Sequence, residues 1–381
     1  MNKLIRSGVS CLIFAFPLAT YADEAKTSIV EPESHIHDIQ FGGSVDLNFR
    51  YEDFSEISKD KQGDISFNKF KLNMHGAING IEFSAQYRWY PYQNVIHHAW
   101  AGYQISEASK IKGGITQAPF GILPYIDNSY WFGPLYYLGL EDDYDSGVSY
   151  SYALDSWNFQ LGFFKNEEWG DSSKSERYSL DLVRSGTQQN EESNQFNIRT
   201  TYTIAQDSGF TTELGLSAMG GQIYNRTSNS NGDRWAGAAH LHGKYGKWTT
   251  AVQITRYEFN PDNPPGVSDQ SIQLGGFAAT YLIASKANAY TLNVARNINI
   301  DHGKLKDMSC YSDNTIVNGG NTVQNTQLHV LGCSFATGPL YTYVDINRAK
   351  NFLWIGGDSI GGQALEDGWQ TMFNVNVGYY F

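Results

Sequence analysis

The chain ends in a segment whose side chains alternate between apolar and polar up to the last residue. The apolar positions are Phe373, Val375, Val377, Tyr379 and Phe381. Because successive side chains of a β-strand point to opposite faces, this segment is a strand with one apolar and one polar face. At the exposed edge of a soluble sheet such a strand would promote aggregation, whereas in a closed barrel it has a neighbour on each side. The segment therefore favours a closed β-barrel.

The same alternation recurs upstream, for example over 39–50, 81–89 and 157–163. Each run is about ten residues, which is enough for a tilted strand to cross an outer membrane. No apolar run after residue 22 is long enough for a membrane-spanning helix. The sequence therefore predicts an all-β fold, a transmembrane antiparallel β-barrel over residues 39–381.

The connections between these runs predict the number of strands. Short connections fall near 77–80, 106–109, 154–156, 205–209, 244–247, 284–288 and 337–339. Longer connections fall near 52–64, 91–95, 118–145, 166–193, 220–233, 258–269, 299–325 and 351–368. Strict alternation of short periplasmic turns and longer outer loops gives sixteen strands, with both chain termini periplasmic. Segment 177–184 breaks the alternation if it is counted as a strand, so it is assigned to a hairpin within an outer loop.

The N-terminus resembles a cleaved secretory signal over residues 1–22, with Lys3 and Arg6 before a short apolar stretch. Residues 23–38 then form a short periplasmic lead. Export of a barrel predicts the outer membrane of a Gram-negative cell, with lipids and lipopolysaccharide as neighbours. A terminal Phe381 after alternating residues resembles the signal that barrel-insertion machinery recognises.

The formal net charge of −12 disfavours a nucleic-acid partner, which requires a basic face. No cofactor, catalytic group or metal site is predicted. His97 and His98 are adjacent, and neighbouring side chains of a strand point to opposite faces, which argues against a shared metal. The acidic run 141–145 lacks the spacing of an EF-hand. Cys310 is placed in an outer loop and Cys333 low on a strand, and whether they pair is left open.

The predicted third outer loop, 118–145, is rich in aromatic residues and is stiffened by Pro119, Pro124 and Pro134. Its only charged residues are acidic. We expect this loop to fold inward and narrow the pore, opposite basic side chains that face the lumen. The predicted constriction consists of Arg50, Lys69, Lys71, Arg88, Lys112, Tyr125, Asp127, Trp131, Glu141 and Asp142.

Residues Gly114 to Gly121 resemble the G-x-x-x-x-P-F-G element at the same strand-to-loop junction of the phosphate-selective porin O and P family. The resemblance implies a Gram-negative outer-membrane porin of sixteen strands, often a homotrimer. It does not imply phosphate selectivity, because the third loop is acidic and no ladder of arginines is evident.

The expected function is a passive diffusion channel for small hydrophilic solutes. One alternative is a substrate-selective porin for anions such as phosphate, or for oligosaccharides, whose rings stack on tyrosine and tryptophan. Another is a barrel adhesin or surface receptor acting through loops 166–193 and 299–325. An enzyme is not expected, because no histidine is grouped with serine or carboxylates as in barrel proteases and phospholipases.

Overall fold

The computed structural model describes residues 36–166, 176–207, 209–320, 325–362 and 368–381. The predicted signal peptide and nearly all of the predicted periplasmic lead lie outside these ranges. The first strand of the barrel begins at Ile36.

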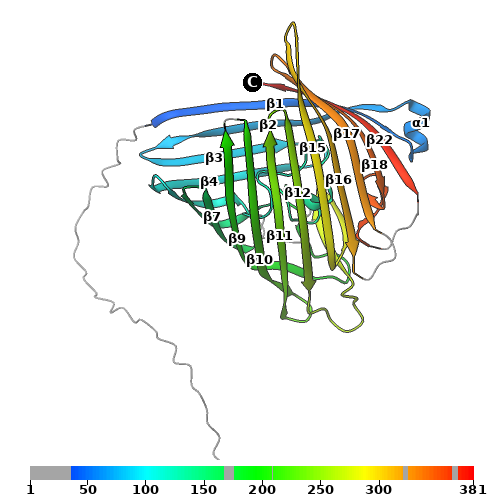
Figure 1. The fold of residues 1–381 in the computed structure, drawn as a ribbon. Helices are drawn as coiled ribbons and strands as arrows, with labels where there is room; N and C mark the ends of the chain where they lie inside the picture. The colour runs from blue at the N-terminus through cyan, green and yellow to red at the C-terminus, as the bar shows by residue number, and fades with distance from the viewer. Residues whose placement is uncertain (1–35, 167–175, 208, 321–324, 363–367) are drawn as a thin grey trace, which may run out of the picture. The chain divides into compact units, whose positions relative to one another are not determined.

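Sixteen strands form one closed antiparallel barrel, as the sequence predicts (Figure 1). Each strand pairs with its neighbour in the chain, apart from short segments that lie in the loops. The barrel strands are β1 (Ile36–Glu52), β2 (Asp64–Ile78), β3 (Ile81–Trp89), β4 (Asn94–Ser106), β5 (Ser109–Gln117), β6 (Tyr144–Leu154), β7 (Trp157–Asn166), β9 (Asn190–Asp207), β10 (Phe210–Asn225), β11 (Ser230–Tyr245), β12 (Trp248–Asn260), β15 (Lys286–His302), β16 (Leu305–Gly319), β17 (Thr326–Thr337), β18 (Leu340–Lys350) and β22 (Trp369–Tyr380).

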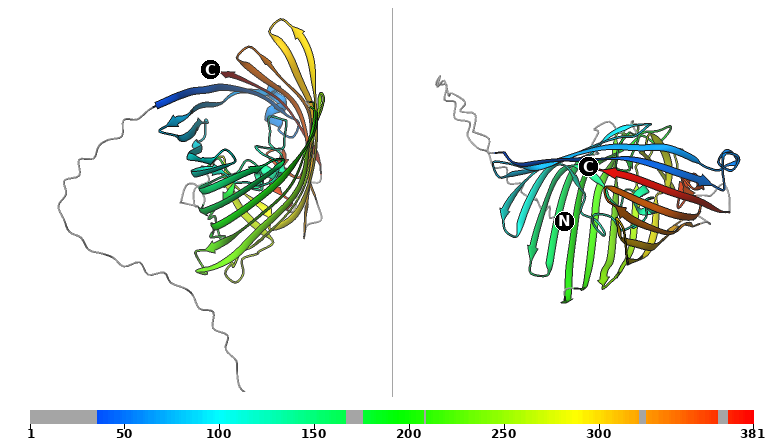
Figure 2. Two further views of the ribbon diagram at one scale, coloured as in Figure 1. Left: turned by 60° about the vertical axis from the view of Figure 1, so that its left-hand side comes forward. Right: turned by 90° about the horizontal axis from the view of Figure 1, so that it is seen from above.

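The first and last strands close the barrel, and Figure 2 shows β22 beside β1. Leu47 lies opposite Val377 in this pairing. Beyond it, Gly43 N donates to Phe381 O at 2.9 Å, and Phe381 N donates to Gly43 O at 3.2 Å. The terminal residue therefore completes the seam with its own backbone.

Polarity alternates across the barrel wall as the strand period requires. On β1, the inward-facing Asp46 is buried, while its neighbours Val45 and Leu47 are 39% and 50% exposed. The outer surface is thus apolar and the lumen polar, the reverse of the arrangement in a water-soluble barrel.

Two predicted segments exchange roles. Residues 271–284 form not a barrel strand but a hairpin of β13 (Ser271–Gly276) and β14 (Ala279–Ala284) within a long loop. The predicted outer loop 299–325 instead contains β16, which follows β15 after a short turn at 303–304. The two errors cancel in the strand count. In both segments the polarity pattern differs from that of an ordinary barrel strand or loop. The hairpin buries an apolar face inside the barrel, whereas β16 has polar residues on both faces.

Because β16 is a strand, the placement of Cys310 in an outer loop is wrong. Cys310 lies opposite Cys333 of β17, with their Cα atoms 4.0 Å apart, and the two form a disulfide.

Three long loops fold into the barrel and build a second sheet there. Segment 177–184 does not form its own hairpin: its strand β8 (Asp181–Leu182) pairs with β13, while β14 pairs with β21 (Ser359–Ile360). The remaining short elements are β19 (Phe352–Leu353), β20 (Gly356–Gly357), and helices α1 (Glu56–Lys61) and α2 (Pro134–Tyr137). Within the described ranges, no helix is long and apolar enough to cross a membrane.

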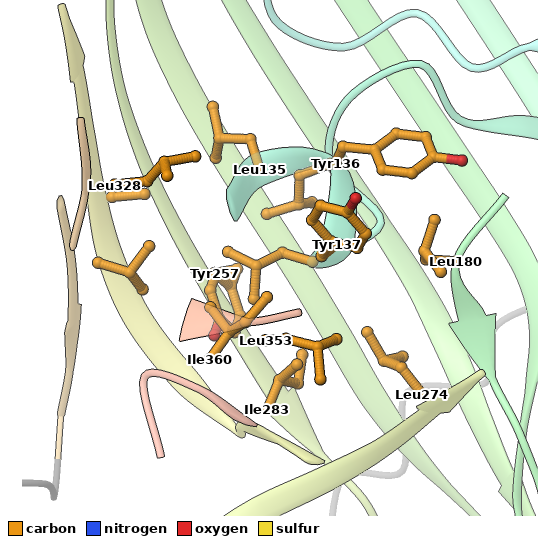
Figure 3. Packing of buried hydrophobic residues seen from close by; sticks show 14 of the residues in the cluster. Leu135, Tyr136, Tyr137, Leu180, Tyr257, Leu274, Ile283, Leu328, Leu353 and Ile360 are labelled. Carbon is orange, nitrogen blue, oxygen red and sulfur yellow. The ribbon is translucent and has the colours of Figure 1, made fainter. Parts of the chain in front are cut away.

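An apolar core fills the space between α2, this inner sheet and the barrel wall (Figure 3). Leu135 of α2, Ile283 of the hairpin and Ile360 of β21 are each at most 1% exposed. Tyr281 OH donates to Tyr137 O at 2.7 Å and so fastens the hairpin to α2. This part of the lumen is therefore packed with side chains.

The seam generates a prediction about Gly43. A Cβ atom there would lie 2.3 Å from Lys71 O and 2.7 Å from the Phe381 ring, so Gly43→Val requires the backbone to move. We expect the variant to be destabilised by about 1–3 kcal/mol, measured as a lower urea midpoint with tryptophan fluorescence. Gly113→Val is the matched control, since a Cβ at that strand position meets nothing within 4 Å. Equal midpoints for the two variants would contradict the prediction.

Candidate pore lining

The loop between β5 and β6, residues 118–143, begins by binding the inner wall. Gly121 N donates to Ser217 Oγ of β10, and Ile122 N donates to Gln253 Oε1 of β12, each at 3.0 Å. Arg199 Nε of β9 donates to Gly121 O at 2.6 Å. Backbone groups of the loop thus replace water as partners of polar side chains in the lumen.

Farther along, the loop is bound by carboxylates of later strands. The backbone N–H groups of Asn128 and Ser129 both donate to Asp313 Oδ2 at 2.8 Å. Tyr130 N donates to Asp345 Oδ2 at 3.2 Å. The sequence pattern does not identify these two carboxylates as loop anchors, and its prediction of Asp313 in an outer loop is wrong.

A cavity of about 700 Å³ lies between this loop and the inner wall of the barrel, where β1 to β3 contribute the cations and β16, β17, β18 and β22 contribute serines and tyrosines. Eight of the ten predicted constriction residues line it. From the wall come Arg50, Lys69, Lys71 and Arg88, and from the loop come Tyr125, Asp127, Trp131 and Asp142.

The other two predicted residues lie elsewhere. Lys112 lines a separate cavity of about 310 Å³. Glu141 is buried within the loop, where it accepts a hydrogen bond from Ile126 N at 2.8 Å. Burial, followed by the nearby Asp127 carboxylate, raises the pKa of Glu141.

Each of the four wall cations lies over an aromatic ring. The cation-to-centroid distances are 5.8 Å for Arg50 and Trp131, 5.3 Å for Lys69 and Tyr130, 4.9 Å for Lys71 and Tyr380, and 4.4 Å for Arg88 and Tyr178. The rings attract the cations through their negative faces.

The four cations differ in how their charge is balanced. Arg50 pairs with Glu52 at 2.9 Å, and Lys69 pairs with Asp46 at 2.6 Å. Among the described residues, Lys71 and Arg88 form no ion pair with a carboxylate. Arg88 is held by neutral groups, with Nε donating to Gln86 Oε1 at 2.7 Å. This wall therefore has net positive charge facing the cavity.

The expectation that His97 and His98 point apart is wrong. A β-bulge interrupts the β3–β4 register between Gln86 and Tyr87, and it turns both imidazoles inward. Their Nδ1 atoms lie 2.8 Å apart, and His98 Nε2 is 2.8 Å from Ser84 Oγ. His97 lines the larger cavity and His98 the smaller one.

On the loop, burial shifts the carboxyl groups. Asp127 accepts hydrogen bonds from Gly133 N at 2.6 Å and Asn293 Nδ2 at 2.8 Å. Burial, then the charge of Asp313, raises the pKa of Asp127 to about 7 despite these bonds. Burial likewise raises the pKa of Asp142 to about 6.

One group of carboxylates, Asp143, Asp145 and Asp181, lies close enough to share a metal ion, with ligand atoms within 4.8 Å of one another. Its members already have other partners. Arg177 Nε lies 3.5 Å from Asp181, and Gln195 Nε2 donates to Asp145 at 3.3 Å. Arg177 thus supplies a positive charge beside this buried group of carboxylates.

No protein-family model matches the sequence, and no curated protein matches it either. Solved structures do match. OmpT of Vibrio cholerae is 12% identical, with a TM-score of 0.56, and the match covers 90% of this chain and 97% of OmpT. The anion-selective porin of Comamonas acidovorans is 12% identical, with a TM-score of 0.54, and the match covers 92% of this chain and 100% of that porin. OmpF of Salmonella typhi, solved with daunomycin, is 10% identical, with a TM-score of 0.57, and the match covers 90% of this chain and 97% of OmpF. The chain shares its fold with outer-membrane porins.

Proposed function

We propose that this protein is an outer-membrane porin, a passive channel for small hydrophilic solutes. The observation that carries the proposal is the polar cavity inside a closed barrel, between a wall with net positive charge and an acidic, aromatic loop. The fold shared with solved porins supports it.

The outer surface fits a membrane. Exposed apolar side chains cover the strands, and tryptophans lie at strand ends where an interface belongs. Trp157 and Trp248, at the ends near the short turns, are 44% and 47% exposed, and Trp369, at the loop end, is 40% exposed. We propose that lipids and lipopolysaccharide surround the barrel. We also propose that the barrel-insertion machinery recognises the strand that ends at Phe381. A homotrimer is proposed as well; one solved form of Vibrio cholerae OmpT is a trimer.

The solute path runs along the basic wall, because the inner sheet and α2 pack the other part of the lumen. Lys71 and Arg88 of the wall line the same cavity as Asp127 and Asp142 of the loop. Opposite charges on two sides of a narrow, water-filled space orient polar solutes and disfavour apolar ones. These residues form the proposed constriction, together with Arg50, Lys69, Tyr125 and Trp131.

The charge balance favours anions over cations, because Lys71 and Arg88 form no ion pair with a described carboxylate. Membership of the phosphate-selective family stays a prediction. We infer that the Pro119-Phe120-Gly121 element serves the loop rather than the solute. Phe120 is buried, and both backbone groups of Gly121 are bound to the wall.

The proposal predicts discrete conductance steps when the purified protein is added to a planar lipid bilayer in potassium chloride. The control is the same protein unfolded in urea and added at equal concentration. Absence of steps from folded protein would refute the channel and favour an adhesin or receptor.

Neutralising the wall should change selectivity. The variant with Lys69→Gln, Lys71→Gln and Arg88→Gln removes three positive charges from the cavity. We expect the reversal potential in a salt gradient to shift toward cation selectivity by on the order of 10 mV. Lys59→Gln, Lys61→Gln and Lys304→Gln together are the control, since they remove equal charge from a helix and a turn outside the cavity. Equal shifts would mean that the three wall cations do not control permeation.

Acidification should act in the opposite direction. Asp127 and Asp142 have pKa values raised to about 7 and about 6, so they are charged above these values and neutral below them. Between about pH 8 and about pH 5 the loop therefore loses negative charge, and the channel should become more anion-selective. Asp127→Asn should remove the upper part of this titration. A reversal potential that is independent of pH would contradict the assignment.

A further inference from the structure

The smaller cavity, which the proposed constriction does not use, is built around Lys112 and Trp100. Its residues lie side by side on neighbouring strands: Ser84 of β3 opposes Trp100 of β4, and Gly102 of β4 opposes Lys112 of β5. Ser84 precedes Arg88 on β3 and lies nearer the short turn that joins β2 to β3. This cavity therefore lies closer than the larger one to the short-turn end of the barrel. Tyr144 lines both cavities, which therefore adjoin.

Glycine makes the central contact possible. Trp100 lies opposite Gly114, where a Cβ would lie 2.3 Å from Ala99 O and 2.9 Å from Trp100 Cα. A Cβ on Gly102 would lie 3.2 Å from both the Trp100 ring and Lys112 Cγ, so these two side chains meet over Gly102. Lys112 Nζ lies 4.2 Å from the ring centroid. Both side chains are only partly buried and face the cavity.

Two lysines share this indole but differ in charge balance. Lys110 Nζ lies 5.3 Å from the same ring and is ion-paired with Glu82. Lys112 forms no ion pair with any carboxylate in the described part of the chain. Its ammonium group is the unbalanced charge of the cavity, and hydroxyl and imidazole groups of Ser84 and His98 lie nearby on the lining.

We propose that this cavity is a second solute-binding station, and that its ligand is a carboxylate attached to a six-membered ring. The carboxylate would bind Lys112 Nζ, and the ring would lie against the exposed part of the Trp100 face. A small inorganic anion would use the cation but not the indole, and a neutral sugar would use the indole but not the cation. The proposal rests on the channel function proposed above.

Aromatic acids and sugar acids share this chemistry, since both carry a carboxylate on a six-membered ring that can stack on an indole, through the flat face of an aromatic ring or the C–H face of a sugar ring. Benzoate and glucuronate are the probes for the two sources, and acetate is the probe for a carboxylate without a ring. Blocking of the open-channel potassium chloride current by each probe gives its block constant. In the wild-type protein, we expect at least one of the ring acids to block more strongly than acetate, and the stronger one identifies the source.

The two lysines provide a matched pair of variants. Lys112→Gln should weaken block by the ring acid about tenfold, the usual effect of losing one charge-assisted hydrogen bond. Lys110→Gln removes the same charge beside the same ring but leaves Lys112 in place, and it should change block by less than about twofold. Trp100→Leu should abolish the advantage of the ring acid over acetate while leaving block by acetate unchanged.

The outcomes separate this proposal from the channel function. Absence of conductance from the wild-type protein overturns both. If the Lys112→Gln variant conducts and the ring acid blocks it as strongly as the wild type, the binding station alone is overturned. Equal effects of Lys110→Gln and Lys112→Gln also overturn it, because the cavity would then act only through its total charge. Conductance of each variant before a probe is added shows that its barrel has folded.

Discussion

Backbone pairing between β1 and β22 is the contact on which the rest of the structure depends. In an open sheet, the edges of these two strands would leave rows of N–H and C=O groups without partners, which a membrane interior does not tolerate. Once they pair, every barrel strand has a neighbour on each side, and the strand period separates an apolar outer surface from a polar lumen. The lumen can then hold buried charges such as Asp313 and Asp345, because backbone N–H groups of the third loop satisfy them.

Those inward carboxylates in turn determine where solutes can pass. They hold the third loop against the strands that follow β9, and the inner sheet packs against the same loop. The space that remains includes the two cavities, whose lining on β1 to β5 carries lysines and arginines. The position of the cavities thus depends on where the third loop is anchored to the wall.

The sequence was sufficient for the fold class, the closing seam and the inward direction of the four wall cations, since each depends on the strand period. Alternation identifies Val375 and Arg88 as outward- and inward-facing without any structure. Alternation does not identify strands correctly where the two faces of a strand do not meet lipid on one side and the lumen on the other. β16 has polar residues on both faces and looks like a loop, whereas β13 and β14 have the apolar alternation of barrel strands because they are buried inside. The bulge beside Tyr87 has no sequence signature that we recognised, and it alone turns His97 and His98 to the same side. Lys112 was identified as inward-facing, but its separation from the other cations depends on how far along the strands the third loop lies.

The inner sheet also bears on the order of assembly. Its four strands come from three loops that are far apart in the sequence, and β8 and β21 have only two residues each. Such short strands gain too little from pairing to meet before the barrel brings their loops together. The wall must therefore form first, and the lumen is filled afterwards. A newly closed barrel would be wider inside than the mature one, and it would narrow only as its loops settle onto α2.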